Sequence, residues 1–130
     1  PDRFEGVFAR QVREHLDRLG YRRVELAHHG RHSVCCGSSG QLGHFHPDWA
    51  REHEEQNLAE ARAAGATVLL ADCQACVLNL ADRAGGSIKV QHALNVLLGF
   101  EENYDDVKKK AAAMFEGEEG EELYLRLYDD

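Results

Sequence analysis

All four cysteines of this 130-residue chain lie in two tight pairs. Cys35 and Cys36 are adjacent and precede Gly37, and after a spacer of 35 residues Cys73 and Cys76 form a Cys-x-x-Cys motif. Thiolates grouped in this way are ligands that zinc and iron–sulfur clusters use in proteins. The pairing therefore predicts that Cys35, Cys36, Cys73 and Cys76 meet at one metal site.

Several neighbouring residues are candidates to support that site. The backbone amide of Gly37 and the hydroxyl of Ser38 could hydrogen-bond a sulfur, and His32 and His44 flank the first pair closely enough to tune or complete a metal shell. Surface positions remain the ordinary alternative for both histidines. We name these residues as possible supporting groups rather than as ligands.

The Cys-x-x-Cys motif also fits a second kind of chemistry. A thiol–disulfide oxidoreductase would use Cys73 as the nucleophile at a helix start and Cys76 as the resolving thiol. That interpretation leaves Cys35 and Cys36 without a role. Buried inert cysteines and a disulfide framework fit less well, because adjacent cysteines make strained bridges.

Composition excludes several other function classes. With 43% hydrophobic residues the chain can bury one core, and no apolar run approaches the roughly 20 residues of a membrane-spanning helix. No signal peptide opens it, which favours a cytoplasmic protein. The arginines between residues 3 and 31 alternate with acidic residues. Nucleic-acid binding is therefore disfavoured.

The elements that must position the cysteines alternate between helix and strand. Apolar spacing predicts helices at residues 8–19, 49–64, 77–84 and 93–98, and strands at residues 21–27, 67–71 and 88–91. The stretch 28–47 is rich in glycine and serine, which is typical of an irregular loop, and Trp49 is predicted to anchor the core. This order predicts an α/β fold, a small parallel sheet with flanking helices. The metal-site loops would then lie at the carboxyl ends of strands, with Cys73 at a strand-to-helix junction.

The last thirty residues differ in charge. Residues 101–130 hold eleven acidic and four basic residues, and therefore most of the net charge of −8. A helix is predicted over residues 103–115, followed by a break at residues 117–120 and a second apolar stripe that starts at Leu123. We divide the chain into a cysteine-rich domain, residues 1–100, and an acidic C-terminal helical extension, residues 101–130. The extension either packs back on the sheet or forms an arm for a partner.

The motifs together resemble a known family. The Cys-Cys-Gly, the spacer, the apolar strand before Cys73 and the helix after Cys76 are similar to the cysteine-rich CCG domain of heterodisulfide reductases, in their B-type chain, and of lactate- and glycolate-oxidising iron–sulfur proteins. The resemblance implies that Cys35, Cys36, Cys73 and Cys76 bind an iron–sulfur cluster, either non-cubane or 4Fe-4S, or in some members a zinc ion. His92 matches a histidine common in the family, with helix capping as the alternative.

The resemblance also carries expectations about ligands and partners. The family motif usually opens with a further cysteine, which would fall at or just before Pro1, and Ser38 stands where the family often has glycine. Such domains work beside other redox subunits or a second CCG domain, with a flavin or a ferredoxin-type protein as the electron partner. An electron-transfer subunit of an oxidoreductase complex is thus the first prediction. A zinc-stabilised interaction module and the thiol–disulfide oxidoreductase are the alternatives.

Overall fold

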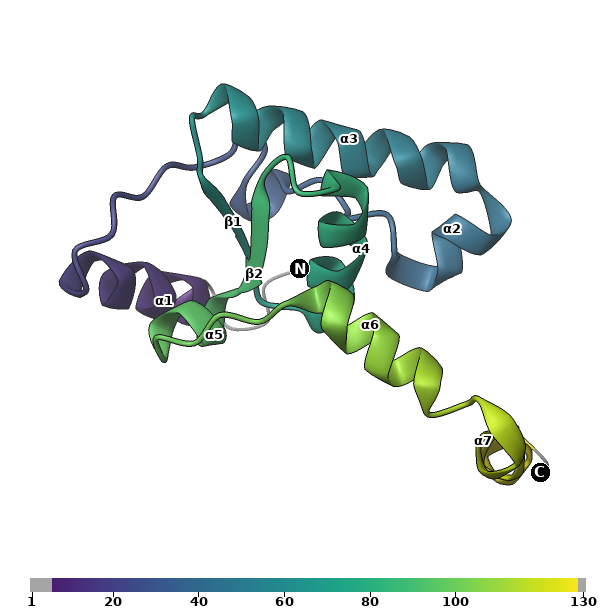
Figure 1. Ribbon diagram of the computed structural model, residues 1–130. Coiled ribbons are helices and arrows are strands. Elements are labelled where there is room, and N and C mark those ends of the chain that lie inside the picture. Colours follow the sequence, from purple (N-terminus) through teal and green to yellow (C-terminus); the bar gives the residue numbers. More distant parts are fainter. Residues whose placement is uncertain (1–5, 129–130) are drawn as a thin grey trace.

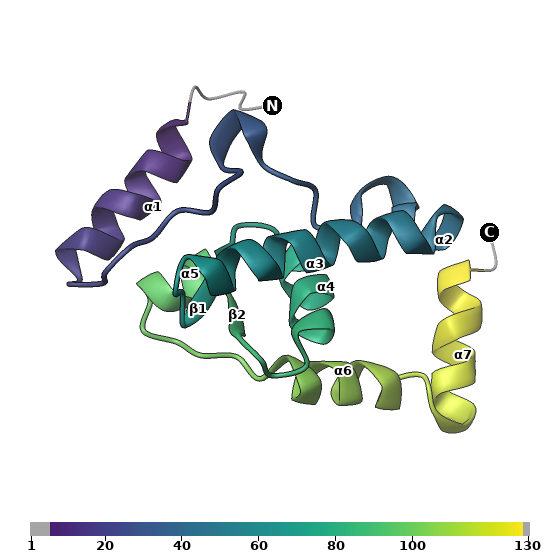
Figure 2. The same ribbon diagram turned by 90° about the horizontal axis from the view of Figure 1, so that it is seen from above.

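The computed structural model describes the backbone of residues 6–128 and the side chains of residues 6–126. Seven α-helices and two strands follow one another in the described chain, with two short 3-10 turns (Figures 1 and 2). In order these are α1 (Val7–Arg18), η1 (Gly30–His32), η2 (Ser39–Gln41), α2 (Leu42–Phe45), α3 (Pro47–Ala63), β1 (Val68–Ala71), α4 (Gln74–Ala84), β2 (Lys89–His92), α5 (Ala93–Leu97), α6 (Tyr104–Ala113) and α7 (Gly117–Tyr128).

The sheet consists of β1 and β2, which pair in parallel. The register aligns Val68 with Lys89 and Ala71 with His92. Parallel neighbouring strands need a crossover connection. Helix α4 follows β1 in the chain and returns it to the end of the sheet at which β2 begins. The α/β class and the parallel pairing are confirmed, and Cys73 follows the carboxyl end of β1 as predicted.

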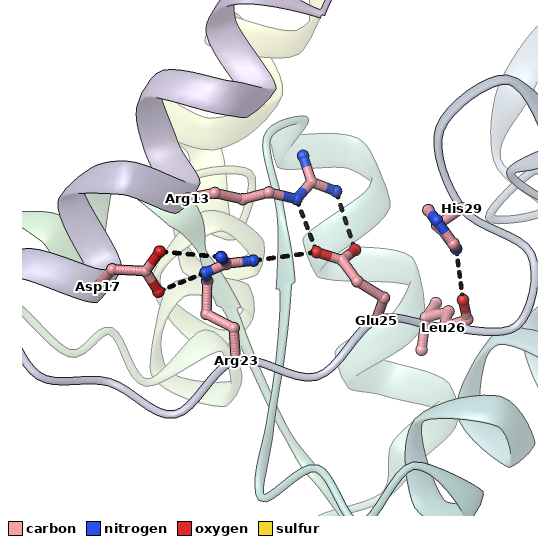
Figure 3. Close-up of polar contacts among 6 residues, drawn as sticks. All are labelled: Arg13, Asp17, Arg23, Glu25, Leu26 and His29. Atoms are coloured by element: carbon pink, nitrogen blue, oxygen red, sulfur yellow. Dashed lines mark hydrogen bonds and ion pairs between the residues drawn. The ribbon is translucent and has the colours of Figure 1, made fainter.

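The strand predicted at residues 21–27 is wrong, because this segment is irregular and does not join the sheet. Its charged side chains bind α1 instead: Arg13 donates to both carboxylate oxygens of Glu25, and Arg23 joins Glu25 to Asp17 (Figure 3). Tyr21 is half exposed, so alternation of apolar and charged residues here does not mark a buried face. The Cys35–Cys36 loop therefore does not follow a strand.

The core forms where α3 and α4 pack against the sheet. Leu58 of α3 and Val77 of α4 are fully buried, and Leu69 and Val90 fill the space from the two strands. Figure 1 shows α3 running across the molecule above α4. Cys36 belongs to the same buried cluster, so the first cysteine pair is tied to the core.

Helix α3 begins two residues earlier than predicted and does not bury its tryptophan. Pro47 occupies the first turn, where a missing N–H costs nothing. Trp49 is 58% exposed and stacks on His46, with 4.5 Å between the ring centroids, so its prediction as a core anchor is wrong. The buried positions of α3 are Ala50, Asn57, Leu58 and Ala61, and Gly37 of the cysteine loop lies against the backbone of Ala50.

The C-terminal extension starts on the core and then leaves it. The side chain of Asn103 caps α6, and the buried hydroxyl of Tyr104 accepts the backbone N–H of His92 at 3.1 Å. Beyond this anchor α6 and α7 project from the body, as Figure 1 shows. The predicted break between two helices is confirmed, but it lies at residues 114–116 rather than 117–120, because α7 begins at Gly117 and includes all four of those residues. None of the described helices is long and apolar enough to cross a membrane.

Candidate metal centre

The fold brings the two cysteine pairs together from different elements. Cys35 and Cys36 lie in the irregular segment between η1 and η2, whereas Cys73 is the N-cap of α4 and Cys76 lies in its first turn. Cys36 Sγ contacts Cys76 Sγ at 2.8 Å, although 40 residues separate them in sequence. All four thiols are free rather than disulfide-bonded.

Cys73 joins this contact through Cys76. Cys73 lies at the start of α4, three residues before Cys76, close enough for the backbone N–H and the thiol of Cys76 to influence its sulfur, although its side chain makes no capping hydrogen bond. This helix-start geometry lowers the pKa of Cys73, whose thiol is exposed. Burial raises the pKa of Cys76, and its hydrogen bond with Cys36 raises it further. The three sulfurs thus form one group with an ionisable thiol at its surface and a neutral one inside.

The group contains suitable donors, but their spacing is not that of a ready-made metal site. Among residues 6–128 no set of three or more His, Cys, Asp or Glu side chains is already spaced to hold an ion. Sulfurs that share a tetrahedral zinc, with Zn–S bonds of about 2.3 Å, lie roughly 3.8 Å apart. The Cys36 and Cys76 sulfurs would therefore have to separate by about 1 Å on binding, a side-chain rotation rather than a refolding.

Two asparagines hold the backbone of the first cysteine pair. The side-chain amide of Asn57 in α3 donates to Cys35 O at 3.0 Å, and that of Asn79 in α4 donates to Cys36 O at 2.6 Å. Asn57 is buried. Asn79 also donates to the carboxylate of Glu54 at 3.0 Å. Sequence reasoning missed both asparagines, although a polar residue on the apolar stripe of each helix was an available signal.

Gly37 lets the loop lie directly on α3. Its φ is +85°, a left-handed conformation that glycine adopts without strain. A Cβ at this position would stand 2.7 Å from the carbonyl oxygen of Ala50 and 3.2 Å from the side chain of Glu54. The glycine after the two cysteines is therefore required by a close backbone approach as well as by its φ angle.

Two of the five predicted supporting residues contact the cysteines. The backbone N–H of Gly37 donates to Cys35 Sγ at 3.4 Å, and the Ser38 hydroxyl lies 3.0 Å from Cys36 Sγ. Either atom of the Ser38–Cys36 pair can be the donor.

The three predicted histidines do not contact a cysteine in the described part of the chain. His32 is exposed in η1, and His44 packs edge-on against Phe45. His92 caps α5: its ring nitrogen Nδ1 accepts the backbone N–H of Leu94 at 3.2 Å. The ring contacts of His44 and His92 go to other residues, and the supporting role of all three histidines stays a prediction.

Another histidine orients the segment that leads to the cysteines. The backbone N–H of His28 donates to Glu60 Oε2 at 2.8 Å, and its ring nitrogen Nδ1 lies 2.5 Å from Glu60 Oε1. The backbone hydrogen bond, aided by the ring, lowers the pKa of Glu60 to about 2. This pair ties the start of the cysteine segment to the far half of α3.

Comparison with known proteins supports the motif. The family model described as CCG, cysteine-rich domain, matches residues 3–81. The matched range covers more than half of the chain and contains all four cysteines and both asparagines. No curated protein and no solved structure matches the chain significantly.

Proposed function

The chain belongs to the CCG family of cysteine-rich domains, and from that membership we propose that it binds an iron–sulfur cluster and transfers electrons. Membership itself supports metal binding. In the proposal Cys35, Cys36, Cys73 and Cys76 are the cluster ligands, and the domain is a redox component of a larger oxidoreductase, similar to those of heterodisulfide reductase.

The observation that carries the proposal is the meeting of thiols from two distant segments. Cys36 Sγ lies against Cys76 Sγ, and Cys73 stands beside them at the start of α4, in a site whose backbone is held by Asn57 and Asn79. Isolated buried cysteines would not need a glycine pressed against a helix backbone to bring them together. A clustered, positioned set of thiols is the donor set that iron–sulfur clusters use.

A bound cluster would supply one-electron transfer, and the chain's residues would hold it and set its surroundings. Cys36 is only 8% exposed, so this side of the site is shielded from water, whereas Cys73 is exposed and would be the natural side for electron exchange. The sequence has no ferredoxin-type Cys-x2-Cys-x2-Cys run and no dinucleotide-binding fingerprint. We therefore propose that another redox subunit, a second CCG domain, or a flavin or ferredoxin-type protein supplies and takes the electrons.

One observation favours zinc as the second candidate. The Cys36 and Cys76 sulfurs lie 2.8 Å apart, near enough to share one ion after the small separation described above. A closed Cys₄ zinc shell would be redox-silent and would stabilise the fold. The domain would then be an interaction module.

The thiol–disulfide alternative also has support in the geometry. Cys73 is exposed at a helix start with a lowered pKa, and Cys76 is more buried with a raised pKa. This is the arrangement of an attacking and a resolving thiol. It does not use the contact between Cys36 and Cys76.

One experiment separates the three functions. The full chain is purified without oxygen, its visible spectrum is recorded, and iron, sulfide and zinc are measured. Brown protein with stoichiometric sulfide supports the iron–sulfur proposal. Colourless protein with one zinc supports the interaction module, and metal-free protein with a titratable Cys73–Cys76 disulfide supports the oxidoreductase.

The site itself is tested by substitution. Cys36→Ser should abolish metal retention, because Cys36 is the thiol that connects the two segments. Ser39→Ala is the matched control, since Ser39 lies in the same loop and is exposed. Metal content that is unchanged in Cys36→Ser would show that the four-cysteine site is wrong.

A further inference from the structure

His53 lies on the face of α3 that carries the cysteine loop. Three residues before it, the carbonyl oxygen of Ala50 is the atom that Gly37 approaches most closely. Four residues after it, Asn57 holds Cys35 O. Residues at these spacings share one stripe of a helix. His53 is therefore placed between the two points at which α3 touches the Cys35–Gly37 segment.

The backbone of His53 is joined directly to the first cysteine pair. The same Asn57 nitrogen that donates to Cys35 O at 3.0 Å also donates to His53 O at 2.8 Å. One amide thus bridges the turn of α3 that carries His53 and the backbone of the cysteine loop. This hydrogen-bonded bridge is independent of the helix spacing, and it too places the backbone of His53 beside the cysteine loop.

The imidazole ring of His53 contains a buried nitrogen that makes no hydrogen bond. Within residues 6–126, His53 Nδ1 is inaccessible to solvent and has no hydrogen-bond partner. Buried polar atoms almost always have a partner, so an exception calls for an explanation, of which a bound ion is one. The side chain as a whole is only partly buried, so the rest of the ring can still adjust its position.

Other histidines of the chain already use a ring nitrogen. The partners are Glu60 Oε1 for His28, Leu26 O for His29 and the backbone N–H of Leu94 for His92. These contacts are structural, since they fix a loop or cap a helix. The buried nitrogen of His53 has no comparable structural role.

We propose that His53 supplies a nitrogen ligand to the metal held by the cysteine sulfurs. The neutral imidazole would donate its Nδ1 lone pair, while the thiols lose their protons to solvent as they bind. Mixed shells of three cysteines and one histidine are common for zinc, and histidine also replaces cysteine at some iron–sulfur centres. The inference rests on the proposed metal site, and it assigns that site a donor from α3.

The test uses Co²⁺ as the probe, added without oxygen to the reduced full chain. Charge-transfer absorption from thiolate to cobalt reports the cysteine ligands, and X-ray absorption at the cobalt edge distinguishes imidazole from sulfur. Wild type should show one imidazole together with sulfur ligands. His53→Ala should lose the imidazole signal and bind Co²⁺ about 10-fold more weakly or worse.

Two further variants keep the test decisive. His53→Cys should restore the affinity with sulfur in place of nitrogen, which shows that loss in His53→Ala is not misfolding. His29→Ala is the control, because its exposed ring bonds only Leu26 O, and it should keep the wild-type spectrum. An imidazole signal absent from wild type, or retained in His53→Ala, overturns the inference.

The outcomes of this experiment distinguish a failure of the His53 inference from a failure of the proposed function. Thiolate-to-cobalt bands without an imidazole would retain the cysteine site and reject His53 as a ligand. An imidazole that is lost in His53→Ala, in a protein that purifies without iron or sulfide, would support His53 and reject the iron–sulfur cluster. Absence of any Co²⁺ binding would overturn both the cysteine site and the role of His53.

Discussion

Gly37→Ala should destabilise the protein much more than the same change a few residues further along the loop. At position 37 the new methyl group meets a backbone atom, because a Cβ there would stand 2.7 Å from Ala50 O. The φ of +85° adds strain for any residue with a side chain. Gly40 has a similar φ of +59°, but nothing lies within 4 Å of a Cβ there.

The backbone strain and the steric clash contribute different amounts to the loss of stability. Left-handed backbone costs an alanine roughly 1–2 kcal/mol, and overpacking against neighbours that cannot retreat costs roughly 1–3 kcal/mol. Gly37→Ala should therefore lose about 2–5 kcal/mol of unfolding free energy. Gly40→Ala should lose only the first contribution, about 1–2 kcal/mol. Such a loss at position 37 is a large part of the roughly 5–15 kcal/mol typical of a domain.

Urea unfolding followed by circular dichroism measures the difference. With a slope of about 1–3 kcal/mol per molar, the midpoint of Gly37→Ala should fall roughly 1–2 M below wild type, and that of Gly40→Ala by distinctly less. Metal retention should fall only in Gly37→Ala, because the clash displaces the Cys36 backbone. Equal losses in the two variants would refute the argument that Ala50 O restricts this position.

Two further changes test the supports of the site. Glu60→Gln should remove a pH-dependent stabilisation: the pKa of Glu60 is lowered from 4.5 to about 2 by His28, so the stabilisation is present above pH 4.5 and is lost as the pH falls toward 2. Thermal midpoints should therefore differ between the two proteins near neutrality and converge near pH 2, and a constant difference across this range would contradict the pairing. Asn79→Ala leaves Cys36 O without its donor and should cost about 1–3 kcal/mol. It should also weaken metal retention, whereas Asn95→Ala, whose amide bonds Glu102 instead, should leave metal content unchanged; equal metal loss in both variants would show that Asn79 has no special role.

Much of the central fold could be predicted from local patterns. The helix before β1, the two strands and the crossover helix are found close to their predicted bounds, because each carries its own apolar periodicity and a glycine end signal. The strand prediction at residues 21–27 failed for a physical reason. Alternation of apolar and charged residues suits a strand, but here the charges of Arg23 and Glu25 are satisfied by α1 rather than by solvent beside a sheet.

The C-terminal extension shows a second limit of local patterns. Gly117 and Gly120 indicate a helix break, yet Gly120 lies inside α7, where a Cβ would collide with the backbone of Phe115. Here glycine allows the turn at Phe115 to lie tightly against the first turn of α7 rather than ending a helix. The division of the chain at residue 100 stays a prediction, although Tyr104 shows that the extension begins inside the core.

The sequence by itself determined the donor chemistry of this protein and the local setting of one cysteine pair. Thiol type, pairing and the strand-to-helix position of Cys73 follow from nearby residues, because ligand preference and helix capping are short-range properties. Tertiary structure alone decided which sulfurs meet. The contact between Cys36 and Cys76, the asparagines that hold the loop and the buried nitrogen of His53 all depend on how α3 packs on α4, which no local pattern specifies.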